Sequence, residues 1–365
     1  MVVEETQMPA SGSPIRSTRT LPEILSQPAA WLASQREAAS AACFPSALQS
    51  LHDASELLFV GCGSSFYLAE AAASAWTLLA GKKGRALPAS ELLLFPDLCA
   101  LDSPGLKAVI ISRSGRTSEA IRAADFLKNR RKMETIGITC CSSSELAAIC
   151  HATVALPSAD ETSMVMTRSF TSMLLALLRL ACPPPSGGLL TDAFASASAA
   201  VGSRIQPLSE RAESFVLQHD FADYVYLAQG PFFPIGREAA LKMTEMSCSY
   251  AQAYHTLEFR HGPKSIVSPE TCITFLLSET GLEAETEVLL EMKHLGGVIV
   301  AICNRASRSV RHAADFLFEL EAGVPEIALL APFLVLPQLL AFHTGLKKGF
   351  NPDEPKHLSR VVILD

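Results

Sequence analysis

The sequence predicts an α/β protein with two domains of the same plan, each a parallel sheet flanked by helices in three layers. Short apolar runs typical of buried strands alternate with segments of helical periodicity along most of the 365 residues. Three pairs of strand ends lie 167, 166 and 163 residues apart: Val60 and Leu227, Ser112 and Ser278, and Cys140 and Cys303. This nearly constant offset indicates an internal repeat, and hence two copies of one domain.

The first half of the chain is expected to hold a tail, a helical segment and the first domain. Residues 1–20, rich in Ser, Thr and Pro, are expected to form a disordered tail, and residues 21–55 to form helices interrupted near Pro45. The first domain is placed at 56–185. It begins with a buried strand at 57–60, a GCGSS turn at 61–65 and an alanine-rich helix to about Leu79. Further strand–helix units are predicted at 106–130, 133–150 and 152–182.

The second half repeats this order. The Pro/Gly/Ser stretch at 183–188 marks the boundary, and connecting helices are expected within 186–218. The second domain is placed at 219–350, with its predicted strands at 224–227, 271–277, 297–303 and 314–320. A helix is expected from about Pro234, another follows the strand at 271–277, and a long apolar helix is predicted at 331–347. Residues 351–365 form a predicted polar C-terminal tail that ends in an apolar, strand-like run.

Composition excludes several classes of protein. The net charge is −7 and the 30 Lys and Arg residues form no long runs, so neither nucleic acid nor a membrane surface is expected as a partner. The ten cysteines include no CxxC pair and the nine histidines show no metal-ligand spacing, so we expect free thiols and no metal. The N-terminus lacks the apolar segment of a secretion signal. Arg179 and Pro337 interrupt the longest apolar runs, which we expect to be too short to cross a bilayer. The expected location is the cytoplasm.

Hydroxyl side chains follow two of the predicted strands. The strand at 106–111 leads into Ser112, Ser114 and Thr117 and then a helix, so backbone N–H groups and a helix dipole favour an anion there. The alternative is that these side chains only cap the helix. The turn at 61–65 lacks the third glycine of a dinucleotide fingerprint, and no acidic residue ends the next strand, at 84–88. The two loops together suit one compact phosphate.

A second group of candidate residues lies at 238–261. Glu238, Lys242 and Glu245 fall at i, i+4 and i+7, so a helix places all three on one face. The alternative is an exposed ladder of charges that only stabilises the helix. Because this helix follows a strand-end loop, a carboxylate and an ammonium in a cleft could instead move a proton at a sugar carbon. His261 precedes Gly-Pro on a predicted turn. It is a candidate functional residue, and the alternative is that it is an ordinary loop histidine without a role in the site.

Five segments carry a resemblance to a known family: GCGSS at 61–65, SRSGRT at 112–117, MTRSFTSM at 166–173, FPIGREAALKMTEM at 233–246 and EFRHGPKS at 258–265. Together they resemble sugar-isomerase (SIS) domains, and the pair resembles the isomerase half of glucosamine-6-phosphate synthase. The chain is also similar to amino-sugar-phosphate deaminases and ketose/aldose isomerases, including the tagatose/galactosamine-type branch. The resemblance covers about residues 22–365 and implies flavodoxin-like SIS domains.

The resemblance also implies roles for particular residues. Glu245 would move the proton between C1 and C2 of the sugar, and His261, donated by the partner of a homodimer, would assist ring opening. Glu238 and Lys242 would support the open-chain sugar. Neither a metal nor an organic cofactor is expected. The residues implied in phosphate binding are Ser65, Ser112, Ser114 and Thr117, with Gly63, Ser64 and Arg113 close by.

Two departures from the synthase narrow the expected activity. No glutamine-hydrolysing domain precedes residue 22, so glutamine is not expected to donate the amine. Arg360 aligns with the lysine that forms an imine in the synthase, and a guanidinium cannot do this; Lys356 is four residues out of register. We therefore expect isomerisation or deamination of a hexosamine 6-phosphate, with gluco and galacto sugars both open. The alternatives are a non-catalytic sugar-phosphate-binding regulator and a deglycase for fructosamine-type phosphates.

Overall fold

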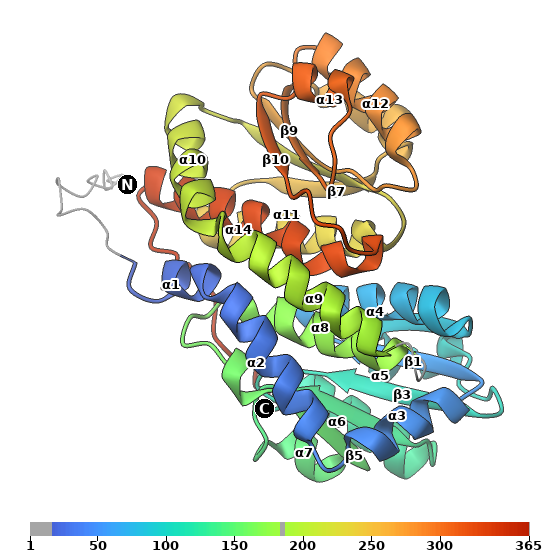
Figure 1. Ribbon diagram of the computed structural model, residues 1–365. Helices are drawn as coiled ribbons and strands as arrows, with labels where there is room; N and C mark the ends of the chain where they lie inside the picture. Colours follow the sequence, from blue (N-terminus) through green and yellow to red (C-terminus); the bar gives the residue numbers. More distant parts are fainter. Residues whose placement is uncertain (1–16, 183–186, 365) are drawn as a thin grey trace, which may run out of the picture.

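Two five-stranded parallel sheets form the framework of the protein (Figure 1). The computed structural model describes residues 17–182 and 187–364. The first sheet has the order β2-β1-β3-β4-β5: β1 (Glu56–Gly61), β2 (Lys83–Pro88), β3 (Leu106–Ile111), β4 (Thr135–Thr139) and β5 (Ala152–Ala155). The second sheet has the order β7-β6-β8-β9-β10: β6 (Asp223–Ala228), β7 (Ala251–His255), β8 (Thr271–Leu276), β9 (Val298–Cys303) and β10 (Phe316–Glu319).

The two sheets confirm the predicted repeat. Read from β2 and from β7, the strands follow the same order, and every neighbouring pair is parallel. Corresponding strands end 164 to 167 residues apart: Gly61 and Ala228, Ile111 and Leu276, Thr139 and Cys303, Ala155 and Glu319. In each sheet the strand order reverses between two neighbouring central strands, β1 and β3 in the first sheet and β6 and β8 in the second. The connections leave these two strands in opposite directions, which opens a crevice at their carboxyl ends, and α/β proteins bind ligands in such crevices.

The first domain begins after three N-terminal helices: α1 (Thr20–Leu25), α2 (Gln27–Ser40) and α3 (Phe44–Asp53). Residues 41–43 form a turn between α2 and α3. Pro45 lies in the first turn of α3, where a backbone N–H has no hydrogen-bond partner within the helix, so the N–H that proline lacks is not needed. The helices of the domain itself are α4 (Ser64–Ala80), α5 (Ala89–Leu94), α6 (Ser118–Asp125), α7 (Glu145–Ile149) and α8 (Arg168–Ala181). The helix predicted after β3 is α6, continued by a π-helical turn at Phe126–Arg130.

The connecting helices and the second domain follow. The connection consists of α9 (Gly187–Gly202) and α10 (Ile205–Gln218). The second domain contains α11 (Phe233–Ser247), α12 (Leu282–His294), α13 (Arg308–Ala313) and α14 (Leu330–Lys347). The edge strand β7 was not predicted, because its sequence AQAYH lacks a clear apolar run and is only partly buried.

A continuous apolar core lies between the two sheets. Leu57 and Phe59 of β1 point into it, whereas Leu58 and Val60 point to the outer layer of α5, α6 and α7. The inner layer of helices includes α4 and α8 from the first domain and α11 and α14 from the second (Figure 1). The helical stretch Glu326–Lys347 is long and apolar enough to cross a membrane, contrary to the expectation from Pro337, but its apolar window is entirely buried in this core.

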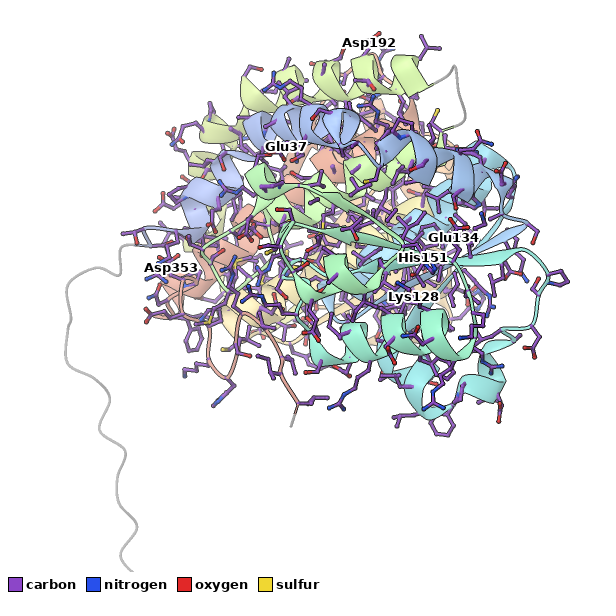
Figure 2. All side chains as sticks on the ribbon, turned by 90° about the horizontal axis from the view of Figure 1, so that it is seen from below. Glu37, Lys128, Glu134, His151, Asp192 and Asp353 are labelled. Atoms are coloured by element: carbon purple, nitrogen blue, oxygen red, sulfur yellow. The ribbon has the colours of Figure 1, made fainter. Side chains whose placement is uncertain are left out.

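The N-terminal end of the described chain packs against Asp353, which follows the last helix and is labelled in Figure 2. Its carboxylate accepts hydrogen bonds from Ser17, from the Thr18 and Arg19 N–H groups and from Thr20, which is wholly buried. Residues 17–20 therefore pack onto the fold, although they belong to the expected tail; the rest of that tail and residues 183–186 lie outside the described residues. The apolar run before the C-terminus forms no strand.

Candidate active site

The amino ends of α4 and α6 lie side by side, because β1 and β3 are neighbours in the sheet. Gly63 caps α4 with a φ of 54°, a conformation that glycine adopts without strain. Ser64 and Ser65 form the first residues of that helix and are buried. Both helix ends therefore direct N–H groups and a positive dipole end toward one edge of the sheet, as the sequence predicted for an anion site.

The loop after β3 is held in shape by its own hydroxyls. The Gly115 N–H donates to Ser112 Oγ at 3.2 Å, the Arg116 N–H donates to Ser114 Oγ at 3.2 Å, and Ser112 Oγ lies 3.4 Å from Thr117 Oγ1. Gly115 has a φ of 62°, and a Cβ there would come within 2.2 Å of Ser144 Oγ. Thr117 caps α6 by position, yet its side chain makes no capping hydrogen bond, so capping alone does not account for this hydroxyl.

Arg113 differs from the role expected for it. Its guanidinium is buried and donates to the carbonyl oxygens of residues 163–165 and of Arg360, and it pairs with Glu161 at 3.6 Å. These bonds direct the side chain into the protein rather than toward a phosphate. Arg113 therefore braces the loop, and only its backbone remains beside the anion site.

Glu238, Lys242 and Glu245 form a buried cluster on α11. The side chains of Glu238 and Lys242 are 0% exposed and that of Glu245 is 17% exposed, so the alternative of an exposed charge ladder is wrong. Lys242 Nζ lies 3.2 Å from Glu238 Oε1, binds Glu245 Oε2, and donates to Ser64 Oγ at 3.1 Å. The structure thus brings the acid–base helix of the second domain against the phosphate turn of the first.

Burial decides the protonation of this cluster. It raises the pKa of Glu238 to about 8; Lys242 opposes the shift, and Glu245 adds to it. Burial alone would lower the pKa of Lys242, but the two carboxylates raise it above its ordinary value. Neither oxygen of Glu238 has a well-aligned hydrogen bond among the described residues. Near neutral pH Glu238 therefore carries a proton that it can give or take.

His261 is not part of this cluster within one chain. It lies exposed at the end of the short helix Glu258–Arg260, before Pro263–Ile266, and its backbone N–H donates to the Glu258 carbonyl oxygen at 2.9 Å. Its ring makes no hydrogen bond or ion pair with any described residue. The donation of this histidine by a partner subunit stays a prediction.

The C-terminal segment lies across the loop after β3. The Val362 and Arg360 carbonyl oxygens accept hydrogen bonds from the Ser118 N–H and from Arg113. The Arg360 side chain pairs with Asp160 at 2.7 Å, and Lys356 Nζ lies 4.6 Å from the centre of the Phe350 ring. Neither cation contacts the buried cluster, so neither stands in for an imine-forming lysine here.

The roles implied by the resemblance require the turn at 61–65 and the helix from about Pro234 to lie at one sugar phosphate, and the structure brings them together. The direct contact between Ser64 and Lys242 was not predicted, because no local pattern shows which residues of the two helices meet. Among the residues that the structure describes, no group of three His, Cys, Asp or Glu side chains could hold a metal ion.

Fold and site together define a pair of α/β domains in which hydroxyls and helix ends lie at the strand ends of the first domain, next to the Glu238–Lys242–Glu245 cluster of the second. The family model of the SIS domain matches residues 50–182 and 224–344, and the chain belongs to this family. The chain is 26% identical over 332 residues to the isomerizing glutamine–fructose-6-phosphate aminotransferase of Aliivibrio fischeri, a match that covers 87% of this chain and 53% of that protein. It thus spans about half the length of the curated relatives it matches.

Solved structures agree over nearly the whole chain. Glucosamine-6-phosphate deaminase from Thermotoga maritima is 29% identical, with a TM-score of 0.76, and the match covers 94% of this chain and 99% of that one. Tagatose-6-phosphate ketose/aldose isomerase from Escherichia coli has a TM-score of 0.83 at 23% identity, over 97% and 98% of the two chains. The second likeness is one of fold.

Proposed function

We propose that the protein is an enzyme that isomerises and deaminates a hexosamine 6-phosphate without a metal or organic cofactor. The observation that carries this proposal is the buried Glu238–Lys242–Glu245 cluster, joined to the phosphate turn at Ser64. A protein that only binds sugar phosphates needs the phosphate loops, but it gains nothing from burying the Lys242 ammonium and the Glu238 carboxyl beside them. That cost in desolvation favours an enzyme over a regulator.

Each part of the site supplies one step of the proposed reaction. The amino ends of α4 and α6 hold the 6-phosphate, which fixes the sugar chain along α11. Glu245, the most accessible member of the cluster, takes the proton from C2 of the open-chain sugar and returns it to C1. Lys242 stabilises the negative charge that develops on the sugar oxygen. The resulting C2 imine reacts with one water and gives ammonia and the ketose 6-phosphate.

The cations near the C-terminus favour deamination or isomerisation over amine transfer. Arg360 pairs with Asp160, and a guanidinium cannot form an imine with a ketose. A substrate that already carries nitrogen at C2 needs no such imine. The likeness to the glucosamine-6-phosphate deaminase of Thermotoga maritima supports the same choice.

A coupled assay over a panel of 6-phosphates tests the proposal. The panel contains glucosamine, galactosamine, tagatose and fructose 6-phosphates and a fructosamine-type 6-phosphate, with ammonia and ketose measured separately. Ammonia and ketose should form in equal amounts from a hexosamine 6-phosphate. Glu245→Gln should abolish turnover while sugar-phosphate binding is retained, because the amide keeps the shape and loses the base. Activity in this variant would contradict the mechanism, and binding without turnover in the unmodified protein would indicate a regulator.

We also propose a cytoplasmic homodimer in which His261 of one subunit completes the site of the other. Mixing Glu245→Gln with His261→Asn subunits tests this. In a hybrid dimer one site has lost both residues and the other has kept both, so random mixing should restore about a quarter of the sites. No recovery from two inactive parents that exchange subunits would show that His261 acts within its own chain or not at all.

A further inference from the structure

The ammonium of Lys242 connects the two domains at the candidate site. Its side chain is wholly buried on α11, and its Nζ donates to Ser64 Oγ on α4 at 3.1 Å. The other two contacts of this nitrogen, with Glu238 and Glu245, are on α11 itself. The ammonium therefore donates to one oxygen on each helix, Ser64 Oγ and Glu245 Oε2, and lies 3.2 Å from Glu238 Oε1 without a well-aligned hydrogen bond to it.

The two adjacent serines at the start of α4 therefore differ. The Ser64 hydroxyl is bound by a buried cation, whereas no described residue forms a hydrogen bond with the Ser65 hydroxyl. Both serines were expected beside the phosphate. The Ser65 hydroxyl can therefore serve a phosphate alone, whereas the Ser64 oxygen is already shared with Lys242.

We propose that Ser64 is a positioning residue: it holds Lys242, and through it Glu245, at a fixed place relative to the phosphate turn, while Ser65 contacts the phosphate. Lysine has a long flexible stem, so a contact with the facing helix limits where its charge can lie. A base that reaches both C1 and C2 must lie at a fixed distance from the phosphate site, because the sugar is anchored there through C6. Small displacements of such a group have large effects on rate. The inference rests on the proposed function only for its kinetic readout.

The charged groups that face this cluster are few. Glu238 and Glu245 act on Lys242 from its own helix, and α4 contributes the neutral Ser64 hydroxyl. Arg237, the neighbouring cation on α11, points away to Glu70 of α4 and lies over the Tyr67 ring. Ser64 also favours the ionised form of Glu238, so its removal should move the pKa of that carboxyl further upward.

Three variants of α4 test the assignment: Ser64→Ala, Ser65→Ala and, as a matched control, Ser74→Ala, whose hydroxyl only bonds to the Glu70 carbonyl oxygen. Ser64→Ala should lower kcat by about 10- to 100-fold, since a hydrogen bond to a buried charge is lost, and should change KM little. Ser65→Ala should raise KM instead. Ser64→Thr keeps the hydroxyl and should recover most of kcat.

Two measurements do not depend on turnover. Inorganic phosphate should raise the melting temperature of the unmodified protein and of Ser64→Ala, but not that of Ser65→Ala. The free energy of unfolding should fall with rising pH as Glu238 loses its proton, and in Ser64→Ala this fall should extend to a higher pH because the pKa of Glu238 is raised further. The assignment is overturned if Ser64→Ala loses its response to phosphate, if its kcat and pH profile are unchanged, or if phosphate does not stabilise the unmodified protein. If no sugar phosphate is turned over, the proposed function fails, and the phosphate and pH measurements still decide the role of Ser64.

Discussion

The loops after β3 and β8 hold the same place in the two domains, but their donors have different partners. After β8, Ser278 donates through its N–H and its hydroxyl to Glu285, at 2.9 and 2.7 Å. The next two N–H groups, of Glu279 and Thr280, both donate to Glu326. After β3, no carboxylate bonds to Ser112, Ser114 or Thr117 among the described residues. The donors of the loop after β8 are bound by carboxylates of the protein itself, whereas the loop after β3 has no bound carboxylate and could accept the anionic group of a ligand.

The turns after β1 and β6 also differ in their side chains, which suit an anion in the first domain but not in the second. Gly63 and Gly230 each lie two residues after the end of a strand and have the same φ of 54°, but α4 begins directly after Gly63, whereas the 3-10 turn Gly230–Phe232 precedes α11. The first turn continues with two serines. The second continues with Phe232, which is wholly buried, and Phe233, which stacks on His255 with 3.7 Å between ring centres. The first turn is therefore followed by hydroxyls, which suit an anion, and the second by aromatic rings, which do not.

The largest effect is expected when the open loop is made like the filled one. Ser114→Asp places a carboxylate in the loop after β3, as Glu326 does after β8. A second negative charge at this position should weaken binding of phosphate and sugar phosphate by roughly 100-fold or more, since like charges in one site cost several kcal/mol. Ser114→Ala removes only a hydroxyl and should weaken binding by about 10-fold. Calorimetric titration with inorganic phosphate measures both; equal losses would mean that charge at this loop does not matter.

A smaller effect is expected from the buried carboxyl of α11. The pKa of Glu238 is about 8 in the folded protein against an ordinary 4.5, so the folded state binds this proton more tightly than the unfolded state. The stabilisation is complete below about pH 4.5 and is lost as pH rises through about 8. The free energy of unfolding should therefore fall by a few kcal/mol across that range. Glu238→Gln, which does not titrate, should flatten the curve in urea denaturation measured from pH 5 to 9. Parallel curves would contradict the raised pKa.

Sequence patterns predicted the repeat and the hydroxyls at neighbouring strand ends, because both depend on local features. Strand runs, strand-end glycines and hydroxyl spacing are visible within ten or twenty residues, and β1 and β3 meet because of a general winding rule. The burial of Glu238 and Lys242 was not predictable in this way, since an i, i+4 pair has the same spacing on an exposed face and in a core. Its cause is the packing of α11 against α4 and α14, which no local pattern encodes.

Arg113 and Glu326 are two further residues whose roles depend on long-range contacts and could not be predicted from local sequence. Arg113 lies within a phosphate-loop motif, yet its guanidinium bonds to carbonyl oxygens of residues 163–165, about fifty positions further along the chain. Glu326 lies in no motif, yet it fills the counterpart loop from 46 residues away. In both residues a long-range contact decides the role, and residue type alone does not.

The smallest effect is expected from emptying the filled loop. Glu326→Ala removes the acceptor of the Glu279 and Thr280 N–H groups, and because these residues are exposed, water can replace it. The cost should be about 1 kcal/mol, a few degrees in melting temperature, and Glu326→Gln should lose less because its amide oxygen still accepts. Millimolar inorganic phosphate should recover part of the loss in Glu326→Ala but not in Glu326→Gln, while KM for the sugar phosphate stays unchanged. Recovery in neither variant would show that the loop after β8 cannot hold an anion even when emptied, and that the two domains differ in backbone detail as well as in side chains.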